Sequence, residues 1–164
     1  MPRTVGLVAR LDKEDALKLA IQIAEYLELK GLEVLVEPKL ADYLGSKAAT
    51  PIEEMRTDLV VTIGGDGTIL RTCLRLPKPE PPILSIDMGV RGFLTEVQPD
   101  EALRAIDHYL EGEFTIRRCS KLASYIGGRR LPDALNEIFI TSRSLAKLLY
   151  IKVWKDGSLV TDCR

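Results

Sequence analysis

The residues best suited to do chemistry lie in one short segment, Gly64–Thr68 (Gly-Gly-Asp-Gly-Thr), which sets a carboxylate among three glycines. A strand-like run, residues 59–63, precedes the segment, and a helix-compatible stretch, residues 69–74, follows it. Glycine lets the backbone approach a ligand closely, and a helix starting here directs unpaired N–H groups at the same place, which suits a phosphate chain. Because a carboxylate repels phosphate, we expect Asp66 to serve a metal ion, a substrate hydroxyl or a tight turn.

A simpler interpretation is that the segment only connects a strand to a helix, with glycines at positive φ and Asp66 as the helix cap. The two common nucleotide-binding loops are excluded in either case. Leu70 stands where the dinucleotide fingerprint requires its third glycine, and the sequence contains no Gly-Lys-Ser or Gly-Lys-Thr.

The elements before this segment predict a parallel α/β sheet. Residues 4–9 form an apolar run typical of a buried strand, residues 15–30 have the apolar periodicity of a helix, and residues 32–36 read as a second strand. Asp12 is a plausible cap for that helix. A third strand ending at Ile63 would place the glycine segment at the carboxyl edge of the sheet, where open α/β folds bind ligands.

The remaining elements of the first half are less regular. Residues 38–57 lack periodicity, and we expect a loop there with one short helix near residues 51–56. A fourth strand, residues 83–86, is followed by a second glycine-containing segment, and a helix over residues 99–110 stops at Gly112. His108 lies off the apolar stripe of this helix, so we interpret it as a surface residue.

From residue 113 onward the pattern becomes β-rich, with Gly127-Gly128 and Asp156-Gly157 as expected hairpin turns. We therefore predict two domains, an α/β nucleotide-binding domain over 1–112 and the start of a β-rich domain over 113–164. Four or so strands make a poor β-sandwich. We therefore expect either that another chain completes this domain or that the sequence is the front part of a longer one, and we favour the second alternative. An apolar run at 134–140, expected as a strand, carries Asn136-Glu137, whose polar groups need partners.

Composition limits the classes of function. The formal net charge is −1, which argues against a nucleic-acid or membrane-surface protein and favours small-molecule partners. No apolar run approaches the roughly 18 residues of a spanning helix, and residues 1–4 do not resemble the start of a signal peptide. Three widely spaced cysteines fit a reducing compartment, so we expect a cytoplasmic protein.

Three features in this order and spacing resemble the NAD kinase family: the Gly64–Thr68 segment, the segment Met88–Leu94, and the pair Asn136-Glu137. The resemblance covers essentially the whole chain. It implies a Rossmann-like α/β domain followed by the beginning of a β-sandwich domain. It also implies transfer of a phosphoryl group from ATP or inorganic polyphosphate to the 2′-hydroxyl of the adenosine ribose of NAD, with a divalent metal, Mg²⁺ or Mn²⁺. Members of the family tend to form homodimers or homotetramers.

The resemblance assigns roles to particular residues. Asp66 is similar to the family's catalytic aspartate, which orients the 2′-hydroxyl and accepts its proton. Asn136 and Glu137 resemble the pair that holds the ribose hydroxyls. Arg71 and Arg91 are expected to contact phosphate. The residues expected to shape the loop around the phosphates are Gly64, Gly65, Gly67 and Thr68.

Two departures and several alternatives accompany this resemblance. Asp87 stands where the family commonly has asparagine, and a carboxylate there could help to bind a metal. The family's later motif rich in Thr, Gly, Ser, Ala and Tyr would lie beyond Arg164.

Diacylglycerol-type lipid kinases and phosphofructokinases share the Gly-Gly-Asp-Gly loop, but neither explains Asn136-Glu137. A non-catalytic NAD-binding or assembly module is the alternative of a different class.

Because the later motif contributes to adenine and ribose contacts, we expect these 164 residues alone to have little kinase activity. The check is NADP formation by the purified chain with ATP or polyphosphate as donor. Robust turnover would contradict the expectation.

Overall fold

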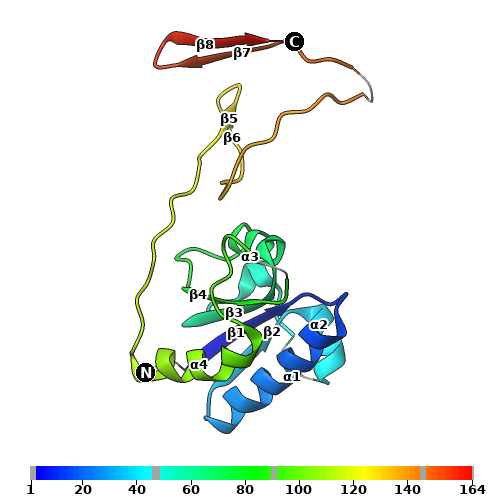
Figure 1. Ribbon diagram of the computed structural model, residues 1–164, viewed down its shortest axis with the longest axis vertical. Helices are drawn as coiled ribbons and strands as arrows, with labels where there is room; N and C mark the ends of the chain where they lie inside the picture. Colours follow the sequence, from blue (N-terminus) through cyan, green and yellow to red (C-terminus); the bar gives the residue numbers. More distant parts are fainter. Residues whose placement is uncertain (1–2, 46–48, 90–91, 145–146, 164) are drawn as a thin grey trace. The chain divides into compact units, whose positions relative to one another are not determined.

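The computed structural model describes residues 3–45, 49–89, 92–144 and 147–163. The chain divides into two compact units, Met1–Lys121 and Leu122–Arg164, which are described separately below (Figure 1). Every helix in the described ranges is too short or too polar to cross a lipid bilayer.

The first unit is built on a four-stranded parallel sheet in the order β2-β1-β3-β4. Its strands are β1 (Thr4–Ala9), β2 (Glu33–Val36), β3 (Leu59–Gly64) and β4 (Ile83–Asp87). The central strands β1 and β3 are apolar and almost entirely buried, as expected for parallel strands covered on both faces. The predicted parallel α/β architecture is confirmed.

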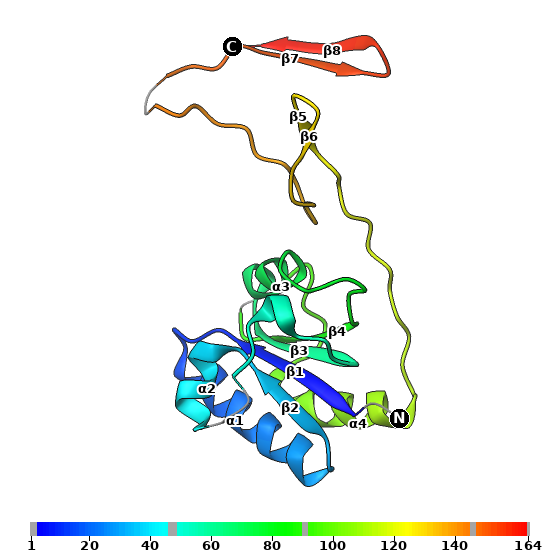
Figure 2. The ribbon, with the colours of Figure 1, turned by 180° about the vertical axis from the view of Figure 1, so that it is seen from behind.

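Helices cover both faces of this sheet (Figures 1 and 2). The helical elements are α1 (Glu14–Leu29), α2 (Pro38–Leu44), α3 (Asp66–Cys73), α4 (Ala102–Glu111) and the 3-10 turns Ile52–Glu54 and Pro99–Glu101. The larger core joins one face of the sheet to α1, α2 and α4. On the other face Val8 and Val60 pack with Ile52, Met55 and Leu76, beside α3. The sheet is thus fixed on both sides, which leaves its carboxyl edge for ligands.

Helix α1 starts without the cap that the sequence suggested. Its N-cap is Lys13, and no side chain caps it. The Asp12 carboxylate instead accepts two hydrogen bonds from the Arg10 guanidinium, at 2.6 and 2.7 Å. The prediction of an Asp12 cap was therefore wrong: Lys13 takes the N-cap position, and the Asp12 carboxylate is held by Arg10 in a bidentate ion pair. The helix ends as predicted before Gly31, which adopts φ +77°.

Helix α2 lies in the segment that was expected to be a loop. It begins at Pro38, whose fixed φ suits the first turn of a helix, and it buries Leu40 and Ala41. Gly45 ends it with φ +61°. The helix has only seven residues, too few to show apolar periodicity in the sequence. The short helix expected near residues 51–56 is the 3-10 turn Ile52–Glu54.

The second unit contains two hairpins in its described residues. They are β5 (Tyr125–Ile126) with β6 (Arg129–Arg130), and β7 (Ile151–Lys155) with β8 (Ser158–Cys163). Both predicted turns are confirmed, since Gly127-Gly128 and Asp156-Gly157 have the positive φ values that tight hairpins need. The strand predicted over 134–140 is absent: only Ala134 forms a bridge, with Leu122. Phe139 is 83% exposed, so this apolar run has no packed face to hold it as a strand.

A hydrogen-bonded cluster ties α1 to α4 and contains a carboxyl group with a lowered pKa. The Tyr26 hydroxyl donates to Asp107 at 2.6 Å, and Lys30 Nζ lies 3.0 Å from the same carboxylate. The Tyr26 hydrogen bond, followed by that of Lys30, lowers the pKa of Asp107. A carboxyl group with a lowered pKa stabilises the fold above its unfolded pKa, and this contribution is lost as the pH falls through the folded pKa.

We therefore expect Tyr26→Phe to lower the free energy of unfolding at pH 7, and the deficit relative to the parent to shrink below about pH 4. Urea unfolding at pH 7 and at a pH below about 4 measures the difference in unfolding free energy between the variant and the parent. Tyr43→Phe removes the hydroxyl of an exposed tyrosine and is the matched control, with no expected change. An equal deficit at both pH values would contradict a role for the Asp107 charge.

Candidate active site

The two glycine-containing segments emerge side by side at the carboxyl edge of the sheet. β3 and β4 pair in parallel with Gly64 opposite Asp87, the last residue of each strand. Helix α3 follows β3 directly, with Gly65 as its N-cap and Asp66 in its first turn. The helix thus starts three residues before the helix-compatible stretch that begins at residue 69. The first turn of α3 therefore lies beside the second segment.

The geometry of the first segment requires glycine at its first position. A Cβ on Gly64 would lie 2.2 Å from Thr68 Oγ1 and 2.9 Å from Thr68 Cβ. Thr68 is itself buried and donates its N–H to the Gly65 carbonyl at 2.9 Å. At Gly65 and Gly67, by contrast, a Cβ would meet nothing within 4 Å. Gly64 and Thr68 therefore lock the turn, while Gly65 and Gly67 leave open space over the backbone.

The Asp66 carboxylate contacts the second segment. Its two oxygens accept the backbone N–H groups of Phe93 and Leu94, each at 3.0 Å. Asp66 is not the helix cap of the simpler interpretation, because Gly65 holds that position and no side chain caps α3. A carboxylate oxygen can accept more than one hydrogen bond, so Asp66 keeps acceptor capacity for a substrate hydroxyl or a metal.

The Asp87 carboxylate holds the same segment from its other side. It is buried and accepts the N–H groups of Gly89 at 2.8 Å and Gly92 at 3.2 Å. A Cβ on Gly92 would lie 2.6 Å from Asp66 Oδ1, so only glycine allows the two segments to approach this closely. Lys13 Nζ adds a hydrogen bond to the Met88 carbonyl at 2.7 Å.

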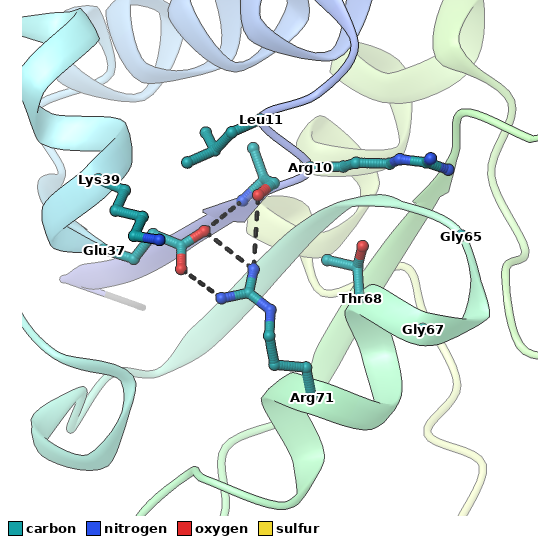
Figure 3. Close-up of a pocket in the computed structure, with 9 residues that line it drawn as sticks. Arg10, Leu11, Glu37, Lys39, Gly65, Gly67, Thr68 and Arg71 are labelled. Carbon is teal, nitrogen blue, oxygen red and sulfur yellow. Dashed lines mark hydrogen bonds and ion pairs between the residues drawn. The ribbon is translucent and has the colours of Figure 1, made fainter.

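A cavity of about 400 Å³ opens in the first unit beside the first turn of α3 (Figure 3). Its lining residues are Ala9, Arg10, Leu11, Glu37, Lys39, Gly65, Gly67, Thr68 and Arg71. Three of the lining side chains are basic and one is acidic; Arg10 is paired with Asp12 and Arg71 with Glu37, which leaves a small net positive charge that favours an anionic ligand. The predicted residues Gly65, Gly67, Thr68 and Arg71 are brought together here.

Sequence reasoning missed three charged residues of this cavity, Arg10, Glu37 and Lys39. Arg10 directly follows β1 and Glu37 directly follows β2. A signal for them existed, because residues just after parallel strands gather at the ligand-binding edge of the sheet. Glu37 is the partner of Arg71, whose guanidinium binds both of its carboxylate oxygens.

The remaining predicted site residues, Asn136, Glu137 and Arg91, fall outside the described residues of the first unit. Asn136 and Glu137 belong to the second unit, where both are exposed in or next to a bend. Their meeting with Asp66 around one ribose stays a prediction. Arg91 lies outside the described residues. His108 is exposed, as predicted, and with Glu111 and Glu113 it forms the one cluster of potential metal ligands found in the described ranges.

Comparison with curated proteins gives relatives that are named as NAD kinases. The NAD kinase of Pyrococcus furiosus is 41% identical over 163 residues, which are 97% of this chain and 58% of that protein. The NAD kinase of Thermococcus kodakarensis is 42% identical with the same coverage. A bifunctional NADP phosphatase/NAD kinase of Methanocaldococcus jannaschii is 36% identical over 99% of this chain and 29% of its own. The chain thus spans less than two thirds of the length of these relatives.

Solved structures agree on the fold. An NAD kinase from Archaeoglobus fulgidus in complex with ATP matches with a TM-score of 0.70 and 27% identity, over 97% of this chain and 56% of that one. A yeast NADH kinase complexed with NADH matches with a TM-score of 0.78 at 20% identity, over 99% and 55%, which shows the fold alone. The sequence-family model of the ATP-NAD kinase N-terminal domain matches residues 5–114 of the chain. The resemblance seen in the sequence is confirmed, and the chain belongs to the ATP-NAD kinase N-terminal domain family.

Proposed function

We propose that the chain supplies the phosphoryl-transfer side of an NAD kinase, which moves a phosphoryl group from ATP or polyphosphate to the 2′-hydroxyl of the adenosine ribose of NAD. One observation carries the proposal. The Asp66 carboxylate lies in the first turn of α3, and the same turn borders a cavity with three basic side chains. A proton acceptor and an anion site are thus adjacent, as transfer to an alcohol requires.

The donor phosphates would occupy the cavity. The N-terminus of α3 offers N–H groups and a positive dipole end, and the open backbone at Gly65 and Gly67 allows close approach. Gly64 and Thr68 fix the turn, and Arg71 contributes a cation on the wall. The Archaeoglobus fulgidus relative was solved with ATP, which supports a nucleotide donor. Arg91 is proposed as a further phosphate contact.

The acceptor hydroxyl would lie against Asp66. As its oxygen bonds to the transferred phosphorus, its proton passes to the Asp66 carboxylate, which the N–H groups of Phe93 and Leu94 hold in one orientation. Asn136 and Glu137 are proposed to hold the ribose diol. The oxygen ligands of Asp66 and the donor phosphates suit Mg²⁺ or Mn²⁺, which would neutralise charge on the transferred group.

We also propose small molecules as the ligands, a cytoplasmic location and a homodimeric or homotetrameric assembly. The relatives are named for small-molecule chemistry, and nothing in the near-neutral net charge favours nucleic acid. In the second unit Trp154 and Ile140 are 59% and 67% exposed, and apolar side chains of this size favour burial in an assembly.

We expect Asp66→Asn to reduce kcat by about 10²- to 10⁴-fold, the usual contribution of a general base, while calorimetric binding of NAD is retained. The asparagine is isosteric and still accepts one backbone N–H. Asp87→Asn is the matched control, because it weakens the same second segment from its other side. We expect a much smaller loss of kcat for that variant, measured in the protein at its full natural length.

Two results would count against this assignment. Equal losses in both variants would mean that Asp66 acts only by holding the second segment. Binding of NAD by the parent protein without any NADP formation would favour the non-catalytic NAD-binding module.

A further inference from the structure

We infer that Glu37 is a positioning residue for the phosphoryl donor. It holds the Arg71 guanidinium against the wall of the cavity, so that the remaining N–H groups of Arg71 are directed at donor phosphates. This inference rests on the proposed function, because it assumes that the cavity receives the donor. It assigns a role to a carboxylate that lies in an anion-binding cavity and therefore needs an explanation.

Glu37 is buried at the carboxyl edge of the sheet, directly after β2. Its side chain is only 7% exposed, and its Oε1 accepts the N–H of Ala9, the last residue of β1, at 3.1 Å. Burial of a carboxylate is unfavourable unless hydrogen bonds and an opposite charge compensate it. Both conditions are met here, since each carboxylate oxygen also accepts a hydrogen bond from Arg71.

Arg71 reaches Glu37 from α3, three residues after Thr68. Its Nη1 donates to Glu37 Oε2 at 2.6 Å, and its Nη2 donates to Oε1 at 3.1 Å and to the Ala9 carbonyl at 3.4 Å (Figure 3). These bonds occupy three of the five N–H groups of a guanidinium, which leaves two for another acceptor. The Arg71 side chain is 39% exposed and lines the cavity, so a ligand can reach it.

The pair connects three elements that border the cavity. Glu37 directly follows β2, Ala9 is the last residue of β1, and Arg71 lies on the helix whose first turn carries Asp66. An arginine without this partner would sample many rotamers, and ordering it on ligand binding would cost conformational entropy. A bidentate carboxylate removes that cost in advance, because the planar fork is held in one orientation.

A positioning role and a simple electrostatic effect of Glu37 predict opposite changes in donor affinity when its charge is removed. A negative charge in the cavity repels a polyanion, so electrostatics alone predicts that removal of the Glu37 charge tightens donor binding. Positioning predicts that the same change weakens donor binding, because Arg71 is released. The sign of the change in donor KM therefore distinguishes the two.

The test is Glu37→Gln in the full-length protein, with kinetics for each substrate. We expect the KM for ATP to rise about tenfold, the size of one lost charge-assisted hydrogen bond, and the KM for NAD to stay unchanged. Calorimetric binding of inorganic tripolyphosphate should weaken in parallel. The double variant Glu37→Gln/Arg71→Gln should bind donor no more weakly than Arg71→Gln alone, because Glu37 acts through Arg71.

Glu53→Gln is the matched control. Glu53 forms a similar bidentate pair with Arg75, at 2.6 and 3.0 Å, just past the end of α3, but neither residue lines the cavity. We expect its donor KM to equal that of the parent. If Glu37→Gln does not fold, Arg71→Lys replaces it, because lysine keeps the charge but loses the fork, and its donor KM should also rise.

A fall in donor KM for Glu37→Gln, additive effects in the double variant, or an unchanged donor KM for Arg71→Lys would each overturn the inference. If one of these results is found for the variants while the parent protein forms NADP, the proposed function still stands. A parent protein that neither binds tripolyphosphate nor forms NADP would overturn both.

Discussion

The contact between the Asp66 carboxylate and the backbone of the second glycine segment is the interaction on which the arrangement of the site depends. It joins the first turn of α3 to the chain that follows β4, through two N–H groups at 3.0 Å. Asp87 holds the same segment from within the sheet. The close approach is possible because position 92 has no side chain.

Around this contact, charge is distributed unequally. The cavity beside α3 is lined by three basic side chains and one acidic residue; Glu37 is paired with Arg71, and Arg10 is paired with Asp12 outside the lining. The Asp66 carboxylate, which we propose as the proton acceptor, contacts the second segment instead. This arrangement suits the proposed reaction, in which a polyanion would approach from the cavity and an alcohol from the side of Asp66.

Much of the first unit was predictable from the sequence for a physical reason. Parallel strands covered on both faces are continuous apolar runs, and β1 and β3 have this character, so their bounds and the position of the glycine segment followed. Helix α2 was missed because seven residues carry too little periodicity, and the Asp12 cap failed because a short ion pair competed with it. Glu37 and Arg71 are 34 residues apart, and a single sequence gives no local sign of such a pair.

The most direct test of the proposed role of Asp66 is a crystal structure of the full-length protein with NAD and a non-hydrolysable ATP analogue. We expect an Asp66 carboxylate oxygen within about 2.6–3.2 Å of the 2′-hydroxyl of the adenosine ribose, with the terminal phosphate of the analogue in the cavity beside Gly67 and Arg71. A 2′-hydroxyl bound elsewhere, with Asp66 still contacting only the backbone of the second segment, would contradict it.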